Sequence, residues 1–128
     1  MKSLDLSRQS STKMLIAELA RQTGVSKDAV RLYERKGLLK GVCARGDNGY
    51  LHFSDAAVER VGEIKTGQDA GLSLGDISVL IEAWYGPDST DTSRLKALKH
   101  LSRDIHQKIT TLSYYADALD KKISTVER

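Results

Sequence analysis

The stretch ELARQTGVSKDAVRLYERKGLL, residues 18–39, breaks in its middle. A run with apolar residues at helical spacing ends at Thr23-Gly24, and a second such run begins after Ser26. Glycine supplies the left-handed conformation that ends a helix at low cost, and serine is a good N-terminal cap. The pattern therefore predicts two short helices joined by a tight turn, the second ending at about Lys36.

These two helices have the spacing of a helix-turn-helix. That motif needs a small residue where the helices cross, a turn glycine four residues later, and apolar residues that lock the helices together. The residues that meet these needs, in order, are Ala20, Gly24, Val25, Val30 and Tyr33. The second helix also carries four basic side chains, at Lys27, Arg31, Arg35 and Lys36. Such a helix suits the major groove of DNA, while a purely structural helix pair with a solvated basic face is the alternative.

The composition permits this interpretation without requiring it. The chain has 128 residues, 40% of them hydrophobic and 29% charged, and a net charge of +3, so it forms one domain or a small domain with an appendage. Seven aromatic residues and one proline argue against a sandwich of many short strands. No stretch approaches the length of a membrane span, and the polar N-terminus lacks the apolar run of a signal peptide. We expect a cytoplasmic protein without a membrane segment.

Residues 38–53, LLKGVCARGDNGYLHF, change character, because short apolar pieces alternate with turn formers. The Asn48-Gly49 pair is the strongest short signal for a hairpin, so a small hairpin is expected here. Ser54 is then expected to cap a third helix that ends near Gly71. Ser73 opens a fourth helix with a Ser-x-x-Asp capping pattern.

From Leu95 onward, apolar residues recur at alternating steps of three and four, which average the 3.5-residue period of a coiled-coil seam. A helix of roughly thirty residues would be about 45 Å long, longer than a compact domain of this size needs. We therefore expect a partner helix; a helix folded back on its own domain is the alternative. The interface residues expected are Leu98, Ile105, Ile109, Leu112, Ala116, Leu119 and Ile123.

Taken together, these features resemble the MerR family of transcription regulators, by motif over residues 14–84 and by architecture over residues 92–128. The matching motifs are Ile16-x-Glu18-Leu19-Ala20, Thr23-Gly24-Val25-Ser26, Arg31-Leu32-Tyr33-Glu34-Arg35-x-Gly37-Leu38-Leu39, Arg45-x-x-Asn48-Gly49-Tyr50, and Gly71-Leu72-Ser73-Leu74 with Ile77 beyond it. The resemblance implies a mainly α fold, with a winged helix-turn-helix DNA-binding domain followed by a long antiparallel coiled-coil dimerisation helix. The expected division is a disordered tail (1–13), the DNA-binding domain (14–85), a linker (86–93) and the dimerisation helix (94–128).

The function that the resemblance implies is sequence-specific transcription regulation. A homodimer would bind double-stranded DNA at a palindromic promoter operator and distort it, so that RNA polymerase can engage the promoter. Arg35 is added to the implied DNA contacts because of its place on the basic helix. The DNA-binding positions expected are Ser26, Lys27, Arg31, Tyr33, Arg35, Arg45, Tyr50 and Lys65. Leu51 stands where an arginine is usual, which favours an alternative: an architectural factor that coats DNA, or contacts proteins, without promoter-specific regulation.

Other kinds of site find little support in the sequence. Cys43 is the single cysteine, so we expect a tolerated small residue and no thiolate metal centre. His100 and His106 lie about 240° apart around a helix, so one chain cannot place both on one metal ion. No paired carboxylates, nucleophile with base, or glycine-rich phosphate motif indicates an enzyme or a cofactor. The aromatic residues that could line a ligand pocket or simply pack a helix junction are Trp84, Tyr85, Tyr114 and Tyr115.

Overall fold

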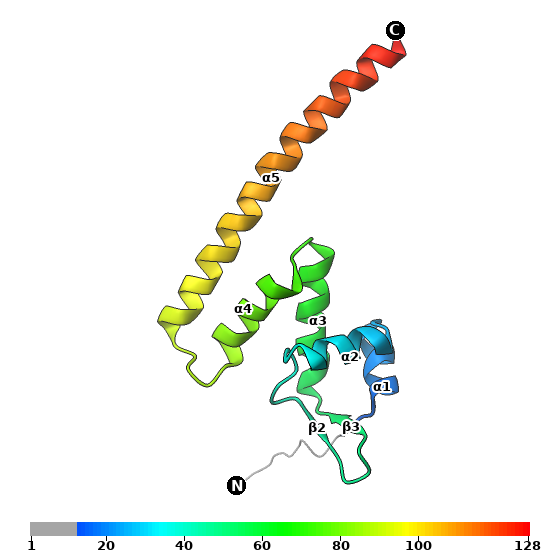
Figure 1. The fold of residues 1–128 in the computed structure, drawn as a ribbon, viewed down its shortest axis with the longest axis vertical. Helices are drawn as coiled ribbons and strands as arrows, with labels where there is room; N and C mark the ends of the chain where they lie inside the picture. The colour runs from blue at the N-terminus through cyan, green and yellow to red at the C-terminus, as the bar shows by residue number, and fades with distance from the viewer. Residues whose placement is uncertain (1–12) are drawn as a thin grey trace. The chain divides into compact units, whose positions relative to one another are not determined.

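The computed structural model describes residues 13–128, which form two compact units, one ending at Ile81 and the other spanning Glu82–Arg128 (Figure 1). Helices dominate, as predicted. In chain order the elements are α1 (Ile16–Thr23), α2 (Lys27–Arg35), β2 (Cys43–Arg45), β3 (Leu51–Phe53), α3 (Ala56–Asp69), α4 (Leu74–Tyr85) and α5 (Asp91–Glu127). The tail predicted over residues 1–13 lies, except for Lys13, outside the described residues.

The predicted helix-turn-helix is present as α1 and α2. Gly24 ends α1 in the left-handed conformation, with φ at 73°, and its N–H donates to the Ala20 carbonyl. Ser26 caps α2, because its side-chain oxygen accepts from the Ala29 N–H at 3.1 Å. Both local predictions for the turn are therefore confirmed.

A small antiparallel hairpin follows α2, as the Asn48-Gly49 pair predicted. Strands β2 and β3 pair with Cys43 opposite Phe53 and Arg45 opposite Leu51, and Gly49 has a φ of 82° in the connecting turn. Met14, just before α1, adds two further backbone hydrogen bonds to Phe53, of 2.9 and 2.8 Å. The hairpin is therefore tied directly to the start of the helix-turn-helix.

The predicted helix starts need two corrections. Ser54 does not cap α3: the cap position is Asp55, without a side-chain cap hydrogen bond, because Ser54 still pairs its backbone N–H with the Val42 carbonyl of the hairpin. The long helix α5 begins at Asp91, three residues before the expected 94. Thr90 and Ser93 cap each other's backbone N–H groups there, which extends the helix into the expected linker.

The core of the first unit draws one apolar face from each of its elements. The largest fully buried side chains are Phe53, Leu19, Leu38, Leu39, Ile64, Val30 and Val61. The apolar faces of α1, α2 and α3 thus supply much of the core. Because α1, α2 and the hairpin share this core, their relative positions are set by packing.

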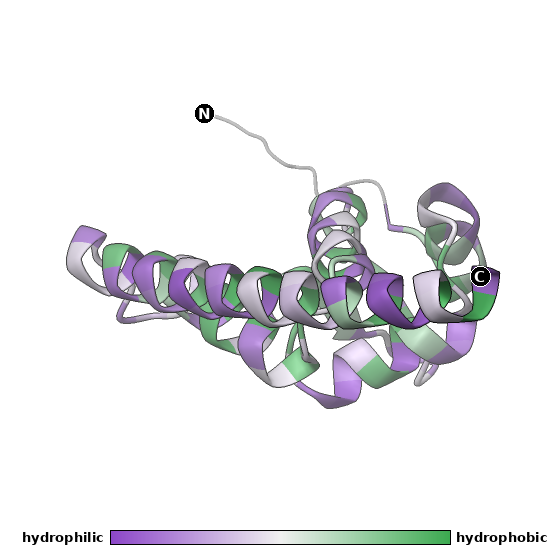
Figure 2. Cartoon of the chain, turned by 90° about the horizontal axis from the view of Figure 1, so that it is seen from above, coloured by the Kyte–Doolittle hydropathy of each residue, from purple (hydrophilic) through white to green (hydrophobic). Residues whose placement is uncertain are grey.

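The second unit is mainly α5, a helix of 37 residues and therefore about 56 Å long. Hydrophobic residues recur along its whole length in Figure 2. Most of the apolar stripe predicted for the interface is exposed within this chain, including Ile109, Leu112, Leu119 and Ile123. Among residues 13–128, no helix combines the length and apolarity needed to cross a membrane.

Candidate nucleic-acid interface

Helix α2, the second helix of the helix-turn-helix, has a buried side and a basic side. Val30 and Tyr33 are buried, whereas Lys27, Arg31 and Arg35 are exposed and follow one another at steps of four residues. Steps of four keep side chains on one helix face, and that face lies away from the buried residues. The helix therefore presents a row of three cations to the solvent.

A groove of about 450 Å³ lies between α2 and the hairpin, and two cations of this row, Arg31 and Arg35, line it. The first turn of α1 lines one part of the groove, with Leu15, Ile16 and Ala17. The other lining residues come from α2 and the hairpin: Arg31, Glu34, Arg35, Arg45, Gly49, Tyr50 and Leu51. Four of the positions predicted to contact DNA, from segments separated in sequence, thus lie around one concave surface.

The hairpin carries two residues that are predicted to contact DNA, Arg45 and Tyr50, and their side chains are held differently. The Arg45 guanidinium donates to the Gly49 carbonyl at 2.8 Å, so the arginine spans the turn. Tyr50 leaves 64% of its surface exposed, and its N–H donates to the Asn48 side chain at 3.1 Å. Leu51 is half-buried and packs against the core. Where the family resemblance led us to expect an arginine, the structure therefore has a side chain that anchors the hairpin.

Tyr33 and Lys65 form a second cluster at α3. The Tyr33 ring is buried, and its hydroxyl donates to the Gln68 side chain at 2.5 Å. Burial raises the pKa of that hydroxyl, so it stays protonated at neutral pH. Lys65 pairs with Asp69 at 2.9 Å. The structure thus confirms the packing role of Tyr33, and the phosphate contacts of Tyr33 and Lys65 stay predictions.

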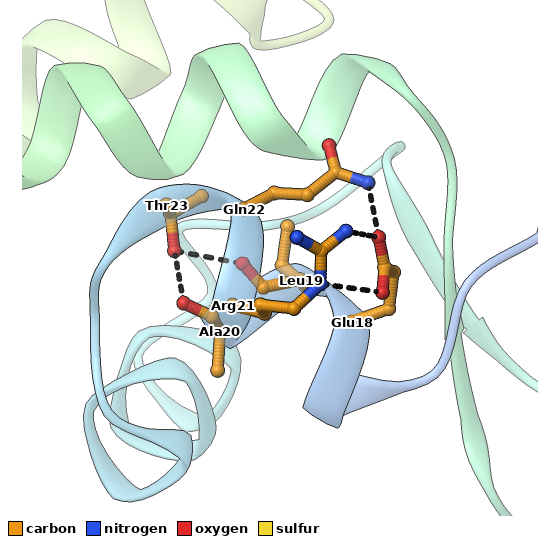
Figure 3. Close-up of polar contacts among 6 residues, drawn as sticks. All are labelled: Glu18, Leu19, Ala20, Arg21, Gln22 and Thr23. Atoms are coloured by element: carbon orange, nitrogen blue, oxygen red, sulfur yellow. Dashed lines mark hydrogen bonds and ion pairs between the residues drawn. The ribbon is translucent and has the colours of Figure 1, made fainter.

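The exposed face of α1 carries a polar network, drawn in Figure 3. Glu18 accepts hydrogen bonds from Arg21 and Gln22, and these bonds lower the pKa of its carboxyl group to about 2. Thr23 donates to the Leu19 carbonyl at 2.8 Å and accepts from the Val25 N–H at 3.4 Å. The first set of hydrogen bonds therefore links the two ends of α1, and the Thr23 bonds hold its last turn immediately before the turn to α2.

Arg60 on α3 is a buried cation that the sequence interpretation missed. Its guanidinium donates to the carbonyls of Leu38 and Lys40, at 3.1 and 3.0 Å, in the segment that joins α2 to the hairpin. Arg60 lies three residues after Ala57 and four before Ile64, on the apolar face of its helix. An arginine at such a position is the signal that could have identified it, because a buried cation needs carbonyl or carboxylate partners.

The residues considered for metal or redox chemistry lie apart. Burial raises the pKa of the Cys43 thiol, which disfavours the reactive thiolate. His100 faces Asp104 at 3.4 Å, and His106 lies 2.7 Å from the Ser102 carbonyl. Within residues 13–128, no group of three or more His, Cys, Asp or Glu side chains is placed to hold a metal ion.

Known transcription regulators are similar to this chain in sequence. An HTH-type transcriptional activator of Chromobacterium violaceum, a SoxR homolog, is 32% identical over 112 residues, covering 84% of this chain and 72% of that protein. An HTH-type transcriptional regulator of Haemophilus influenzae is 27% identical over 112 residues, covering 88% of this chain and 82% of that protein.

A solved structure and a family model agree with these relatives. The crystal structure of HiNmlR, a MerR family regulator lacking the sensor domain, bound to promoter DNA, superposes with a TM-score of 0.67 at 26% identity and covers 88% of this chain and 89% of that one. The model of the MerR HTH family regulatory proteins matches residues 14–84, more than half of the chain. The chain therefore belongs to the MerR family of helix-turn-helix transcription regulators.

Proposed function

We propose that this protein binds promoter DNA as a homodimer and thereby controls transcription. The observation that carries the proposal is the groove where Arg31 and Arg35 of α2 meet Arg45 and Tyr50 of the hairpin. Three arginines outnumber the one acid, Glu34, around this concave surface. The excess of positive charge suits a phosphate backbone, and α2 can then enter the adjacent major groove. HiNmlR, whose fold this chain shares, is itself bound to promoter DNA in its crystal structure.

The predicted contacts divide by position on this surface. Ser26 and Lys27 lie at the N-terminus of α2, which in helix-turn-helix proteins lies nearest the base edges, and Arg31 follows one turn later on the same face. Arg35, Arg45 and Tyr50 would meet the backbone beside it. Tyr33 of α2 and Lys65 lie together near the end of α3. They would contact one phosphate as a pair once the Tyr33 hydroxyl leaves Gln68 and the Lys65 ammonium leaves Asp69.

The homodimer is proposed from the exposed stripe of α5. From Leu95 to Val126 the steps between stripe residues are 3, 4, 3, 4, 3, 4, 3, 4 and 3, so the pattern is the same in either direction. Two antiparallel copies can therefore align their stripes over the full length, with Ile109 beside Leu112 of the partner subunit. The same alignment places the small Ser102 and Ala116 against Leu119 and Ile105 of the partner subunit, so that small residues face large ones.

Within this proposal, residues 14–85 form the DNA-binding domain. The dimerisation helix expected over residues 94–128 is α5, which begins at Asp91 and so shortens the linker expected over residues 86–93. We further propose that the bound dimer distorts its operator so that RNA polymerase engages the promoter, as the resemblance to the MerR family implies. A dimer with two recognition helices would require a palindromic operator, because each half-site meets one copy of α2.

The test is binding to the DNA that lies immediately upstream of the protein's own gene, measured by fluorescence anisotropy across a salt series. The parent should bind this duplex more tightly than a scrambled duplex of equal length. Arg31→Ala should weaken binding at least tenfold with unchanged helix content, because it removes a base or phosphate contact worth about 1–3 kcal/mol. Arg103→Ala, which removes an exposed arginine from α5, is the matched control.

Two results would contradict this assignment. If scrambled DNA competes as well as the upstream duplex, the protein is the architectural factor considered as the alternative. If Arg31→Ala binds like the parent at every salt concentration, α2 is not the reading helix.

A further inference from the structure

Asp28 is an acidic residue on the basic face of the recognition helix. It is the second residue of α2, and 94% of its side chain is exposed, so it has no part in the core. Arg31, one turn later and half exposed, donates from Nη1 to the Asp28 carboxylate at 3.0 Å. The residue most suited to read a base is therefore held by the one acid of the first turn.

An acid at this position weakens the attraction between α2 and any duplex. Both grooves of DNA are lined by phosphates, and each carboxylate brought among them opposes the counterion-release term that drives binding. The favourable interaction of Asp28 with the positive end of α2 gives it a structural benefit, but that effect is modest for an exposed side chain. The contact with Arg31 suggests a second role.

The Arg31 guanidinium has enough N–H donors to bind the Asp28 carboxylate and a guanine base at the same time. Arginine carries five N–H groups in a rigid plane, and a single hydrogen bond to Asp28 leaves four for another ligand. Guanine presents two acceptors, N7 and O6, on its major-groove edge, which a planar pair of N–H groups can meet at once. An arginine held in position by a neighbouring carboxylate loses less side-chain freedom when it makes this contact.

We propose that Asp28 is a positioning residue that makes Arg31 selective for guanine. This inference rests on the proposed function, in which α2 reads the major groove. On a duplex with guanine opposite Arg31, the ion pair and the base contact coexist. On any other duplex Arg31 must leave Asp28 to reach a phosphate, and the carboxylate is then left unpaired beside the DNA. Asp28 thus weakens binding to the wrong sequences more than to the right one.

The experiment uses the full chain and duplexes that the unmutated protein selects from a random-sequence library. Each G·C pair of a selected duplex is changed in turn to A·T, and dissociation constants are measured by fluorescence anisotropy at one salt concentration. Asp28→Asn keeps the size of the side chain and removes its charge. Asp76→Asn is the matched control, because Asp76 is a first-turn acid of α4. Arg31→Lys marks the base pair that Arg31 reads.

In the parent, one G·C change should weaken binding at least tenfold, and Arg31→Lys should abolish that difference. Asp28→Asn should reduce the same difference to threefold or less and should bind random duplex at least threefold more tightly than the parent. Asp76→Asn should keep the discrimination of the parent. Adding Asp28→Asn to Arg31→Lys should change the discrimination no further, because the effect of Asp28 passes through Arg31.

Three results would overturn the proposal. Asp28→Asn could retain the parent's discrimination, or it could change the affinity for all duplexes by one common factor; in either case Asp28 acts only on α2 or on net charge. Discrimination lost at a base pair other than the one marked by Arg31→Lys would assign Asp28 a base contact of its own. A parent that selects no sequence from the library would refute the proposed function itself, which is a result of the unmutated protein and not of the variant.

Discussion

The two units of this protein treat the same kind of hydrophobic pattern in opposite ways. In the first unit the apolar faces of α1, α2 and α3 converge, and residues such as Phe53 and Leu19 have no exposed surface. In the second unit α5 repeats apolar residues just as regularly, yet Leu112 keeps 68% of its surface exposed. The comparison teaches that apolar periodicity predicts a helix face that packs against another element. The periodicity does not reveal whether that element belongs to the same chain or to a partner.

The largest effect is expected for substitutions in the exposed apolar stripe of α5, and it falls on the stability of the proposed dimer. Ile109→Asp combined with Leu112→Asp places four charges in the proposed seam of a dimer and removes four apolar side chains, each worth about 1.5–3 kcal/mol when buried. The dimer should weaken more than a thousandfold, as measured by light scattering over a dilution series.

Tyr114→Asp is the control for the seam. Tyr114 is 80% exposed and lies about 140° around the helix from Ile109, so the dimer should survive this change. An unmutated protein that is monomeric at micromolar concentration would contradict the homodimer.

The second-largest effect concerns the first unit, which buries its own apolar side chains, and it falls on the free energy of unfolding. Phe53→Ala removes the largest fully buried side chain and should cost about 3–5 kcal/mol of unfolding free energy, measured by urea denaturation. Tyr50→Ala, on the same hairpin but exposed, should cost much less. Equal losses in the two variants would show that burial does not distinguish these neighbouring aromatic residues.

A smaller effect tests the alignment proposed for α5. In the antiparallel register Lys99 lies beside Asp120 of the partner subunit, and each exposed ion pair of this type contributes about 0.2–1 kcal/mol. Lys99→Glu should weaken the dimer several-fold, and adding Asp120→Lys should restore it, as measured by sedimentation equilibrium at low salt. Lys96→Glu, away from the stripe, should have little effect. If the dimer of the double variant is no more stable than the dimer of Lys99→Glu alone, this register is excluded.

The smallest effect concerns the surface of the first unit. Because the fold lowers the pKa of the Glu18 carboxyl from its ordinary 4.5 to about 2, the unfolded chain takes up the proton at higher pH than the folded chain. The contribution of Glu18 to stability is therefore complete above pH 4.5 and is lost as the pH falls towards 2. Melting temperatures should fall less steeply over this range in Glu18→Gln than in the parent. A carboxyl resonance of Glu18 that titrates near 4.5 would contradict the shift.

Much of the architecture could be predicted because its signals act over a few residues. Gly24 and Ser26 define the turn between α1 and α2 through backbone conformation and a local cap, and both behave as predicted. Asn48-Gly49 likewise predicts the hairpin. A local capping signal failed where a longer-range backbone hydrogen bond competed with it. Ser54 is a good cap by residue type, but its backbone N–H pairs with the carbonyl of Val42, twelve residues earlier.

The candidate DNA surface was predicted as a list of residues, and only the tertiary structure decided how they group. The sequence by itself determined which faces of the helices are apolar and which are basic, since these follow from helix geometry. It could not place the hydroxyl of Tyr33 on Gln68, find two carbonyl partners for Arg60, or bring Arg45 to the groove beside Arg31. The reason is physical: a polar side chain takes whichever partner the packed core brings within hydrogen-bond distance, and that partner is set by contacts far apart in the chain.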